Sequence, residues 1–239
     1  MKKLAIVATG ALALAGLGVG VSSAVTPTLG ISAKVSPTKH GTKKKPAKVK
    51  LVVKLSTTPN PADQPFAADS TVVHLAKELA FNGKALKQCS STQVASDDTK
   101  CPKGSKVGFG TAAGVALGLT ENLKVTAYNG PGGKKLELLV DGQTPLAIHS
   151  VIEGVLSKDS GLYGNKLTVA IPPDLQQPAP GAYATLEEFD TTINAISGKK
   201  KAPYVGMISC KTKKMTFGVD YHYVPDNSQA SATTTAPCK

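Results

Sequence analysis

Between residues 49 and 224 the chain alternates between apolar and polar positions in short runs, which turn-forming residues separate. The run 215–223 is the clearest example, because every second residue is apolar: Met215, Phe217, Val219, Tyr221 and Tyr223. The positions between them hold Thr216, Gly218, Asp220 and His222. A period of two predicts a strand with one buried face, as in an antiparallel sheet.

Nine further runs have strand-like patterns, and Gly, Pro, Asn and Asp residues separate them. They are 49–55, 71–75, 106–111, 123–128, 135–140, 148–156, 166–171, 183–193 and 204–210. The fourth and fifth flank Asn-Gly-Pro-Gly-Gly at 129–133, which predicts a hairpin with a longer loop. About ten short strands predict an all-β protein, an antiparallel β-sandwich of the Ig-like or jelly-roll-like kind. The one short helical turn expected is at 91–96.

The segments on either side of this predicted domain, 49–224, differ from it in composition. Residues 25–48 are rich in Pro, Thr, Ser and Lys and hold few apolar residues, so they are predicted to be a flexible linker. Residues 225–239 are predicted to be a low-complexity tail that is tethered only by Cys238. Neither segment is expected to contribute to the core.

Residues 1–24 have the layout of a secretory signal. Lys2 and Lys3 give a positive head, residues 4–21 form an uncharged apolar run, and residues 22–24 are small. An uncleaved membrane anchor is the alternative, but the glycines within the run disfavour a helix. Cleavage after Ala24 is therefore predicted, which places the mature chain outside the cell.

The mature chain contains four cysteines, Cys89, Cys101, Cys210 and Cys238. An even number in an oxidising compartment indicates two disulfides, for which three pairings exist. Cys89–Cys101 and Cys210–Cys238 are favoured because the members of each pair are nearest in sequence. A metal site would need tighter spacing of the C-x₂-C kind, so no metal is predicted.

The chain has a formal net charge of +12 at pH 7, and every basic residue is a lysine. Because bidentate recognition of phosphate and guanine depends on arginine, a nucleic-acid partner is not expected. Lysines attract anionic polymers weakly and also simply keep a protein soluble. The predicted contact for such polymers is the lysine cluster, Lys43, Lys44, Lys45, Lys48 and Lys50. A merely solvated surface is the alternative.

The sequence contains no catalytic or cofactor motif. His74, His149 and His222 lie in strand-like runs without partners at motif spacing, so each is interpreted as a rim or core residue. Glu187 and Glu188 would point to opposite faces of a strand and cannot act as an acid–base pair. The alternative is a secreted hydrolase or metal-dependent enzyme whose histidines and carboxylates come together only in the folded chain.

Two segments resemble a known group of proteins. The first contains Phe81-Asn82-Gly83, then Cys89, then Cys-Pro-Lys-Gly-Ser-Lys-Val-Gly at 101–108. The second is Gly-Leu-Tyr-Gly-Asn-Lys-Leu at 161–167, followed by residues 171–178. Together they resemble uncharacterised secreted β-rich proteins of high-GC Gram-positive bacteria, over most of 51–189. The resemblance implies an extracellular β-rich domain with a Cys89–Cys101 bridge, and it implies no activity, substrate or catalytic residue.

These patterns predict a secreted, non-enzymatic protein that is extracellular or associated with the cell envelope. Its expected partners are anionic cell-envelope polymers, bound weakly, or another extracellular protein. No cofactor is expected, and no membrane span is expected once the signal is cleaved. The strand order and the oligomeric state are left open.

Overall fold

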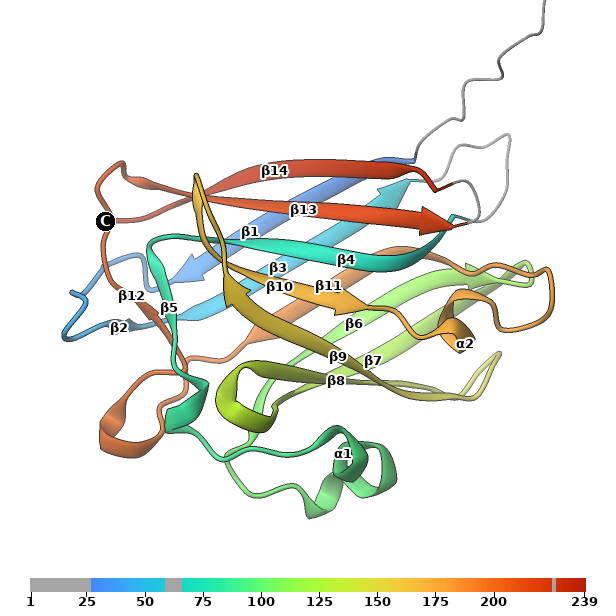
Figure 1. Ribbon diagram of the computed structural model, residues 1–239, viewed down its shortest axis with the longest axis horizontal. Helices are drawn as coiled ribbons and strands as arrows, with labels where there is room; N and C mark the ends of the chain where they lie inside the picture. The colour runs from blue at the N-terminus through green and yellow to red at the C-terminus, as the bar shows by residue number, and fades with distance from the viewer. Residues whose placement is uncertain (1–26, 59–65, 225–226) are drawn as a thin grey trace, which may run out of the picture.

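The computed structural model describes residues 27–58, 66–224 and 227–239. The predicted signal sequence, 1–24, therefore lies outside the described residues. The described chain is mainly antiparallel β-structure with a few short helical segments (Figure 1). None of the helices in these three ranges has the length and apolar character needed to cross a membrane.

The structure confirms the ten predicted strands, with shifted ends, and adds four more. The strands are β1 (Thr28–Ser36), β2 (Ala47–Lys48), β3 (Lys50–Thr58), β4 (Ala67–Ala76), β5 (Leu79–Phe81), β6 (Lys106–Ala116), β7 (Leu119–Asn129), β8 (Lys135–Gly142), β9 (Ile148–Lys158), β10 (Tyr163–Ala170), β11 (Thr185–Ile193), β12 (Val205–Met207), β13 (Lys214–Val224) and β14 (Gln229–Pro237). The helices are α1 (Ser91–Asp97), where the helical turn was predicted, and α2 (Pro173–Gln176). Short 3₁₀ turns are η1 (Gly83–Ala85), η2 (Asp98–Lys100), η3 (Pro131–Gly133) and η4 (Lys199–Lys201).

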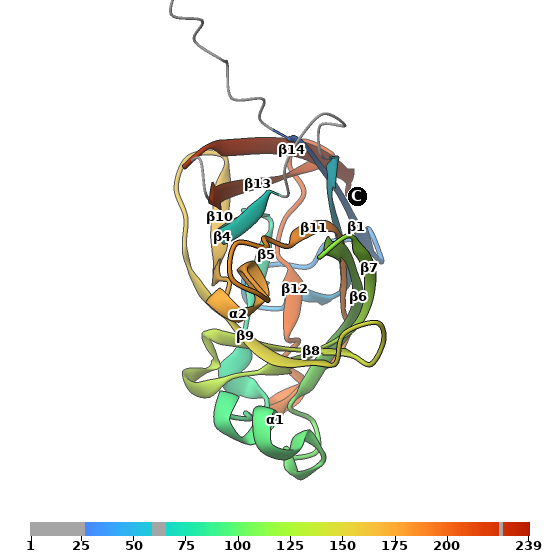
Figure 2. The same cartoon turned by 90° about the vertical axis from the view of Figure 1, so that its right-hand side faces the viewer.

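Eleven strands form one sheet in the order β1-β3-β11-β6-β7-β8-β9-β10-β4-β13-β14. Its two end strands, β1 and β14, lie side by side, so the sheet is nearly closed into a barrel (Figures 1 and 2). The prediction of an all-β antiparallel protein is confirmed, and the prediction of a β-sandwich is wrong. Both architectures need strands with one apolar face, so alternation alone does not distinguish them.

The strands that meet at this seam come from the segments predicted to be a linker and a tail. β1 pairs with β3 from Thr28 to Ser36, and β14 pairs with β13 from Gln229 to Pro237. The core-facing side chains of both strands are mostly small or aliphatic: Ile31, Ala33, Val35, Ala230, Ala232 and Ala236. The linker prediction for 25–48 and the tail prediction for 225–239 are therefore wrong for these strands, because composition concealed a period-two alternation.

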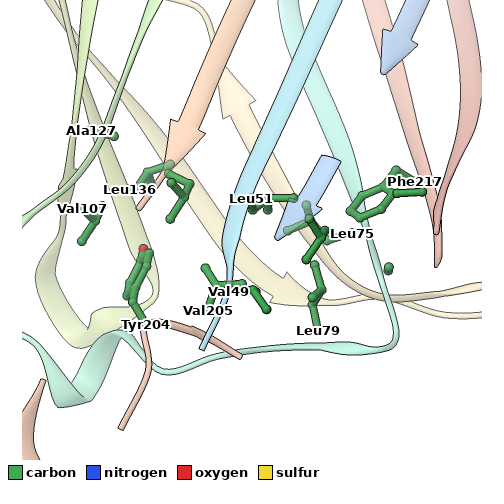
Figure 3. Packing of buried hydrophobic residues seen from close by; sticks show 14 of the residues in the cluster. Val49, Leu51, Leu75, Leu79, Val107, Ala127, Leu136, Tyr204, Val205 and Phe217 are labelled. Carbon is green, nitrogen blue, oxygen red and sulfur yellow. The ribbon is translucent and has the colours of Figure 1, made fainter. Parts of the chain in front are cut away.

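A separate three-stranded sheet, β2-β12-β5, covers one end of the barrel. The backbone N–H of Val49 donates to the carbonyl oxygen of Val205 at 3.2 Å, and both side chains are fully buried. Figure 3 shows them packed with Tyr204 and Leu79 at this end of the core. Fully burying a Val or Leu side chain contributes about 2 kcal/mol. Helix α2 lies at the opposite end of the barrel (Figure 1).

Small residues on β6 shape the interior near α2. A Cβ atom on Gly110 would clash with the carbonyl oxygen of Asp190, so β6 and β11 can approach this closely only with glycine there. Further along β6, Ala112, Gly114 and Ala116 also face the interior. Because their side chains are small, they leave space between β6 and the opposite wall.

The segment that carries α1 packs on the outside of the barrel, against β7, β8 and β9. The Ser90 hydroxyl accepts the Gln93 N–H at 3.3 Å and so caps the helix. Val94 is buried in a small apolar cluster with Cys89, Tyr128 and Leu139. The structure confirms both favoured disulfides: Cys89–Cys101 holds this outer segment, and Cys210–Cys238 joins the ends of the β13–β14 hairpin. Two disulfides indicate folding in an oxidising environment.

Candidate functional site

The barrel interior contains a cavity of about 130 Å³. Strands β3, β4, β8, β9, β10 and β11 supply most of its lining, which is mainly aliphatic and aromatic. Representative lining residues are Val53, Val73, Leu138, Ile152, Leu167 and Phe189. Apolar cavities of this size stay dry and bind apolar molecules about as large as benzene. We call this space the inner cavity.

A wider cavity, of about 470 Å³, adjoins the inner cavity at the α2 end of the barrel. Four residues line both spaces: Ile152, Ile171, Leu186 and Phe189. The wider cavity is bordered by the small residues of β6, by the loop 143–147 and by the segment 171–184 that carries α2. We call it the mouth cavity. The two spaces together give an apolar interior with a broader opening.

Glu121 of β7 is the buried charged residue of the mouth cavity. The alternation of β7 places it on the same face as Leu123 and Val125, and only 3% of its surface is exposed. Its Oε1 accepts the backbone N–H of Leu146 at 3.0 Å. Its Oε2 is buried and has no hydrogen-bond partner among the described residues. An unpaired buried carboxylate oxygen is costly, so it marks a place where a ligand can donate.

Three other polar residues at the mouth cavity are either paired or exposed. Thr185 Oγ1 accepts the backbone N–H of Phe66 at 2.8 Å. His149 contacts Asp141 Oδ1 through Nδ1 at 2.6 Å and the carbonyl oxygen of Ala95 through Nε2 at 3.0 Å. Asp174 on α2 is exposed. In the described part of the chain no lysine lines this cavity, although Lys is the sole basic residue type besides His.

The three strand histidines do not come together. His74 on β4 and His222 on β13 lie on neighbouring strands, but four positions apart in register, which is roughly 13 Å. His149 lies on β9 and pairs with its own aspartate. His222 Nδ1 lies 2.8 Å from Asp69 Oδ1. The geometry predicted for the enzyme alternative, with histidines at ligand distance, is therefore not formed by these residues.

His74 has the most developed of these contacts. Its Nδ1 lies 2.6 Å from Asp159 Oδ2 and its Nε2 lies 2.8 Å from Asp220 Oδ2, while its ring stacks on Tyr163. Burial by itself lowers the pKa of His74, but the two aspartates outweigh it and the pKa is raised. Both ring nitrogens of His74 therefore have a partner. Through them, His74 joins β4 to Asp159, just after β9, and to Asp220 on β13. Within the described ranges, no group of three or more His, Cys, Asp or Glu side chains is arranged to hold a metal.

A second buried acid, Glu137, lies outside the cavity, on the outer face of β8. It is fully buried, and neither carboxylate oxygen has a hydrogen-bond partner among the described residues. Burial raises its pKa to about 7; the Glu153 carboxylate adds to the rise and Lys135 opposes it. Its effect is therefore on stability near neutral pH.

The predicted polymer-contact lysines lie at the end of the barrel that the small sheet covers. All five are exposed. Backbone hydrogen bonds join their loop to two other segments: Gly41 to Met207 at 3.0 Å, and His40 to Lys239 at 2.8 Å. We call the resulting surface the basic end; its exposed lysines are Lys39, Lys43, Lys44, Lys45, Lys48, Lys50, Lys211, Lys213, Lys214 and Lys239. The segments 37–50, 208–214 and 238–239 contain no Asp or Glu.

Sequence reasoning missed the cavity and Glu121. The signal for Glu121 was present, because a period of two puts it in line with Leu123, Val125 and Ala127. The cavity itself gave no sequence signal, since it depends on how the sheet closes. The lysines of 211–214 were also missed, because their segment is joined to residues 38–40 only in the folded chain, through Cys238 and Lys239.

A scan of protein-family models found no match to this chain, and searches of curated proteins and of solved structures found none either. The resemblance to secreted proteins of Gram-positive bacteria stays a prediction. The features of this protein that could hold a ligand are the apolar cavities of its barrel and the few polar groups placed at their mouth.

Proposed function

We propose that this protein is a non-enzymatic, extracellular binding protein that holds a small, largely apolar molecule inside its barrel. The observation that carries the proposal is the contiguous pair of cavities, about 130 Å³ and about 470 Å³, with mainly apolar linings. Ligand sites in proteins are typically clefts of roughly 300–1,000 Å³ lined by apolar side chains with a few placed polar groups. The mouth cavity has that size and composition.

The energetics favour an apolar occupant. Transfer of apolar surface from water into such a lining contributes roughly 25 cal/mol per Å². The barrel wall is a hydrogen-bonded sheet, so the site is held open without a ligand, which reduces the ordering cost of binding. The two disulfides support an extracellular location, and so does the predicted signal sequence at 1–24.

Filling the mouth cavity tests the proposal. Ala112 is buried and lines this cavity, whereas its neighbour Thr111 faces outward and is exposed. N-phenyl-1-naphthylamine, a neutral apolar fluorophore, is titrated into wild type, Ala112→Leu and Thr111→Leu, and its emission is recorded. Since the chain has no tryptophan, the probe signal is easily separated from the protein's own. Wild type and Thr111→Leu are expected to bind saturably, with binding at least tenfold weaker in Ala112→Leu. Non-saturating binding, or equal binding by all three proteins, would contradict the proposal.

The basic end supports a second function, weak attachment to anionic cell-envelope polymers. Its ten lysines come from segments without a single acid, so their potentials add at one end of the molecule. Such attraction is screened over about 8 Å at physiological ionic strength, so it should fall steeply with salt. Lysine lacks the guanidinium fork, so the contact is expected to depend on charge more than on polymer geometry.

Two variants, each with five Lys→Gln substitutions, lose the same amount of charge from different surfaces. Comparing them distinguishes binding by the basic end from binding that depends only on the total charge of the protein. The test variant changes Lys43, Lys44, Lys45, Lys48 and Lys50. The control variant changes five exposed lysines of other segments, Lys100, Lys103, Lys106, Lys124 and Lys158. Sedimentation with isolated cell walls at low and moderate salt is expected to show loss in the test variant only. Equal binding by both variants, or binding indifferent to salt, would argue against a role for the basic end.

A further inference from the structure

We propose that the ligand is amphipathic and that its polar head is a hydrogen-bond donor, a hydroxyl or an ammonium group, which Glu121 accepts at the mouth cavity. This inference rests on the proposed function, because it describes the occupant of the same cavity. The apolar part of the ligand extends past Leu186 and Phe189 into the inner cavity. A carboxylate head, as in a fatty acid, is disfavoured.

The Glu121 side chain has unused hydrogen-bonding capacity at the mouth cavity. One carboxylate oxygen is used by the Leu146 N–H at 3.0 Å, and the other is buried without a partner in the described part of the chain. A carboxylate accepts about four hydrogen bonds, so capacity for a donor remains. Leaving a charged group unpaired in an apolar site costs more than leaving a neutral one. A ligand that donates to Glu121 removes that cost, and a purely apolar ligand does not.

The second argument is the sign of the charge at the mouth cavity. Of the described residues that line it, the ones with a carboxylate are Glu121 and Asp174, and none is a lysine. His149 is also part of the lining, but its Nδ1 already contacts Asp141 Oδ1 at 2.6 Å. In a chain with net charge +12, this end of the barrel is locally acidic. A second carboxylate beside Glu121 would meet repulsion, and no lysine among the described lining residues would offset it.

The third argument is the arrangement of polar and apolar parts. Four residues, among them Leu186 and Phe189, line both cavities, so a chain-like ligand can pass from one to the other. Two lysines, Lys134 and Lys135, border the inner cavity at its other side, and Lys135 Nζ is held by Glu153 at 2.7 Å. An anionic head bound there would require the reverse ligand orientation. The head-group test below distinguishes the two orientations.

Displacement of N-phenyl-1-naphthylamine by three ligands of equal chain length tests the head group. The competitors are 1-decanol, decylamine and decanoate, used below their critical micelle concentrations. Decylamine and decanol are expected to displace the probe from wild type at concentrations at least tenfold lower than decanoate. A decylamine preference over decanol would assign an ammonium head, and the reverse order a hydroxyl head. Equal displacement by all three, or strongest displacement by decanoate, would overturn the inference.

Two isosteric variants assign the preference to one side chain. Glu121→Gln keeps a carbonyl oxygen for the Leu146 N–H but removes the charge, and it is expected to reduce the decylamine-to-decanoate ratio at least fivefold. Asp174→Asn removes the exposed charge of the same cavity and is expected to leave that ratio within twofold. Loss of the ratio in Asp174→Asn alone would contradict the role of Glu121.

The outcomes separate this inference from the proposed function. If the probe binds and Ala112→Leu weakens it, but head groups are not distinguished, the cavity function stands and the Glu121 anchor is rejected. If no probe or competitor binds to wild type, both fail. The wild-type order of the three competitors stands as a test even where a Glu121 variant is unstable.

Discussion

Oε1 of Glu121 lies 3.0 Å from the backbone nitrogen of Leu146, so the loop between β8 and β9 is tied to strand β7 of the barrel wall. The same residue that lines the mouth cavity therefore also fixes one of its borders. The proposed ligand binding and the order of this loop are therefore expected to be coupled through the Glu121 side chain.

Glu121→Leu is expected to increase the hydrogen-exchange rate of the Leu146 amide by about tenfold, because loss of one hydrogen bond to a charged group is worth at least about 1.4 kcal/mol. Glu121→Gln retains an acceptor and is expected to leave the rate near that of wild type. Exchange is measured by NMR on the folded protein. An equal rate in all three proteins would show that the contact does not hold the loop.

Because the pKa of Glu137 is raised, its contribution to the stability of the fold is expected to fall as the pH rises towards neutral. Its pKa is raised from 4.5 to about 7 in the folded chain, so between these values the folded state binds more protons than the unfolded state. The contribution of Glu137 to stability is therefore greatest below about pH 4.5 and is lost as the pH rises to about 7, by roughly 3 kcal/mol.

The measurement is urea unfolding of wild type and Glu137→Gln from pH 4.5 to pH 7.5. The variant is expected to gain stability relative to wild type as pH rises, because Gln is neutral throughout. Comparing the two proteins at each pH cancels the contributions of the other titrating groups. A constant difference across this pH range would contradict the raised pKa.

Substitution of Thr191 by valine is expected to stabilise the fold. Its hydroxyl lines the inner cavity, is buried and has no hydrogen-bond partner among the described residues. Thr191→Val removes this unpaired group with little change of shape and is expected to stabilise the fold by about 1 kcal/mol. Thr71→Val is the matched control, because the Thr71 hydroxyl is hydrogen-bonded to Tyr221, and it is expected to destabilise by about 1 kcal/mol. Thermal unfolding of both variants checks the signs, and destabilisation by Thr191→Val would refute the argument.

The two disulfides are expected to differ in their contribution. The loop-entropy relation gives about 3 kcal/mol for Cys89–Cys101 and about 3.5 kcal/mol for Cys210–Cys238, since their sequence separations are 12 and 28. Cys210–Cys238 also holds β14 against the seam with β1, whereas Cys89–Cys101 holds a segment outside the barrel.

Paired Cys→Ser variants are compared by urea unfolding and by probe binding. Loss of Cys210–Cys238 is expected to lower stability more and to weaken probe binding, because the barrel seam loosens. Loss of Cys89–Cys101 is expected to leave probe binding near wild type. The opposite order would show that the outer segment, and not the seam, supports the cavity.

The sequence alone determined the class of structure and most of its strands. The alternation at 215–223 and the loop at 129–133 predicted β13 and the β7–β8 hairpin, because strand faces and turns are encoded by neighbouring residues. The disulfide partners were also predictable, since each pair is close in sequence. The histidines were interpreted as rim or core residues, and the structure gives each strand histidine its own carboxylate partner.

Only the tertiary structure decided that the sheet nearly closes on itself. That outcome depends on β1 meeting β14, two strands about 200 positions apart whose small inward residues, such as Ala33 and Ala232, give a weak hydrophobic pattern. The curled sheet encloses the interior. Glu121 is buried at the mouth cavity, with an oxygen free to accept a hydrogen bond, because the sheet curls in this way. At the other end, backbone hydrogen bonds join Cys238 to Lys213 and Lys239 to Thr38, so the lysine-bearing segments 211–214 and 38–50 are linked there through the chain end. Alternation is a local property of the chain, whereas closure, cavities and charge segregation are properties of contacts between distant segments, and these are fixed only when the whole sheet forms.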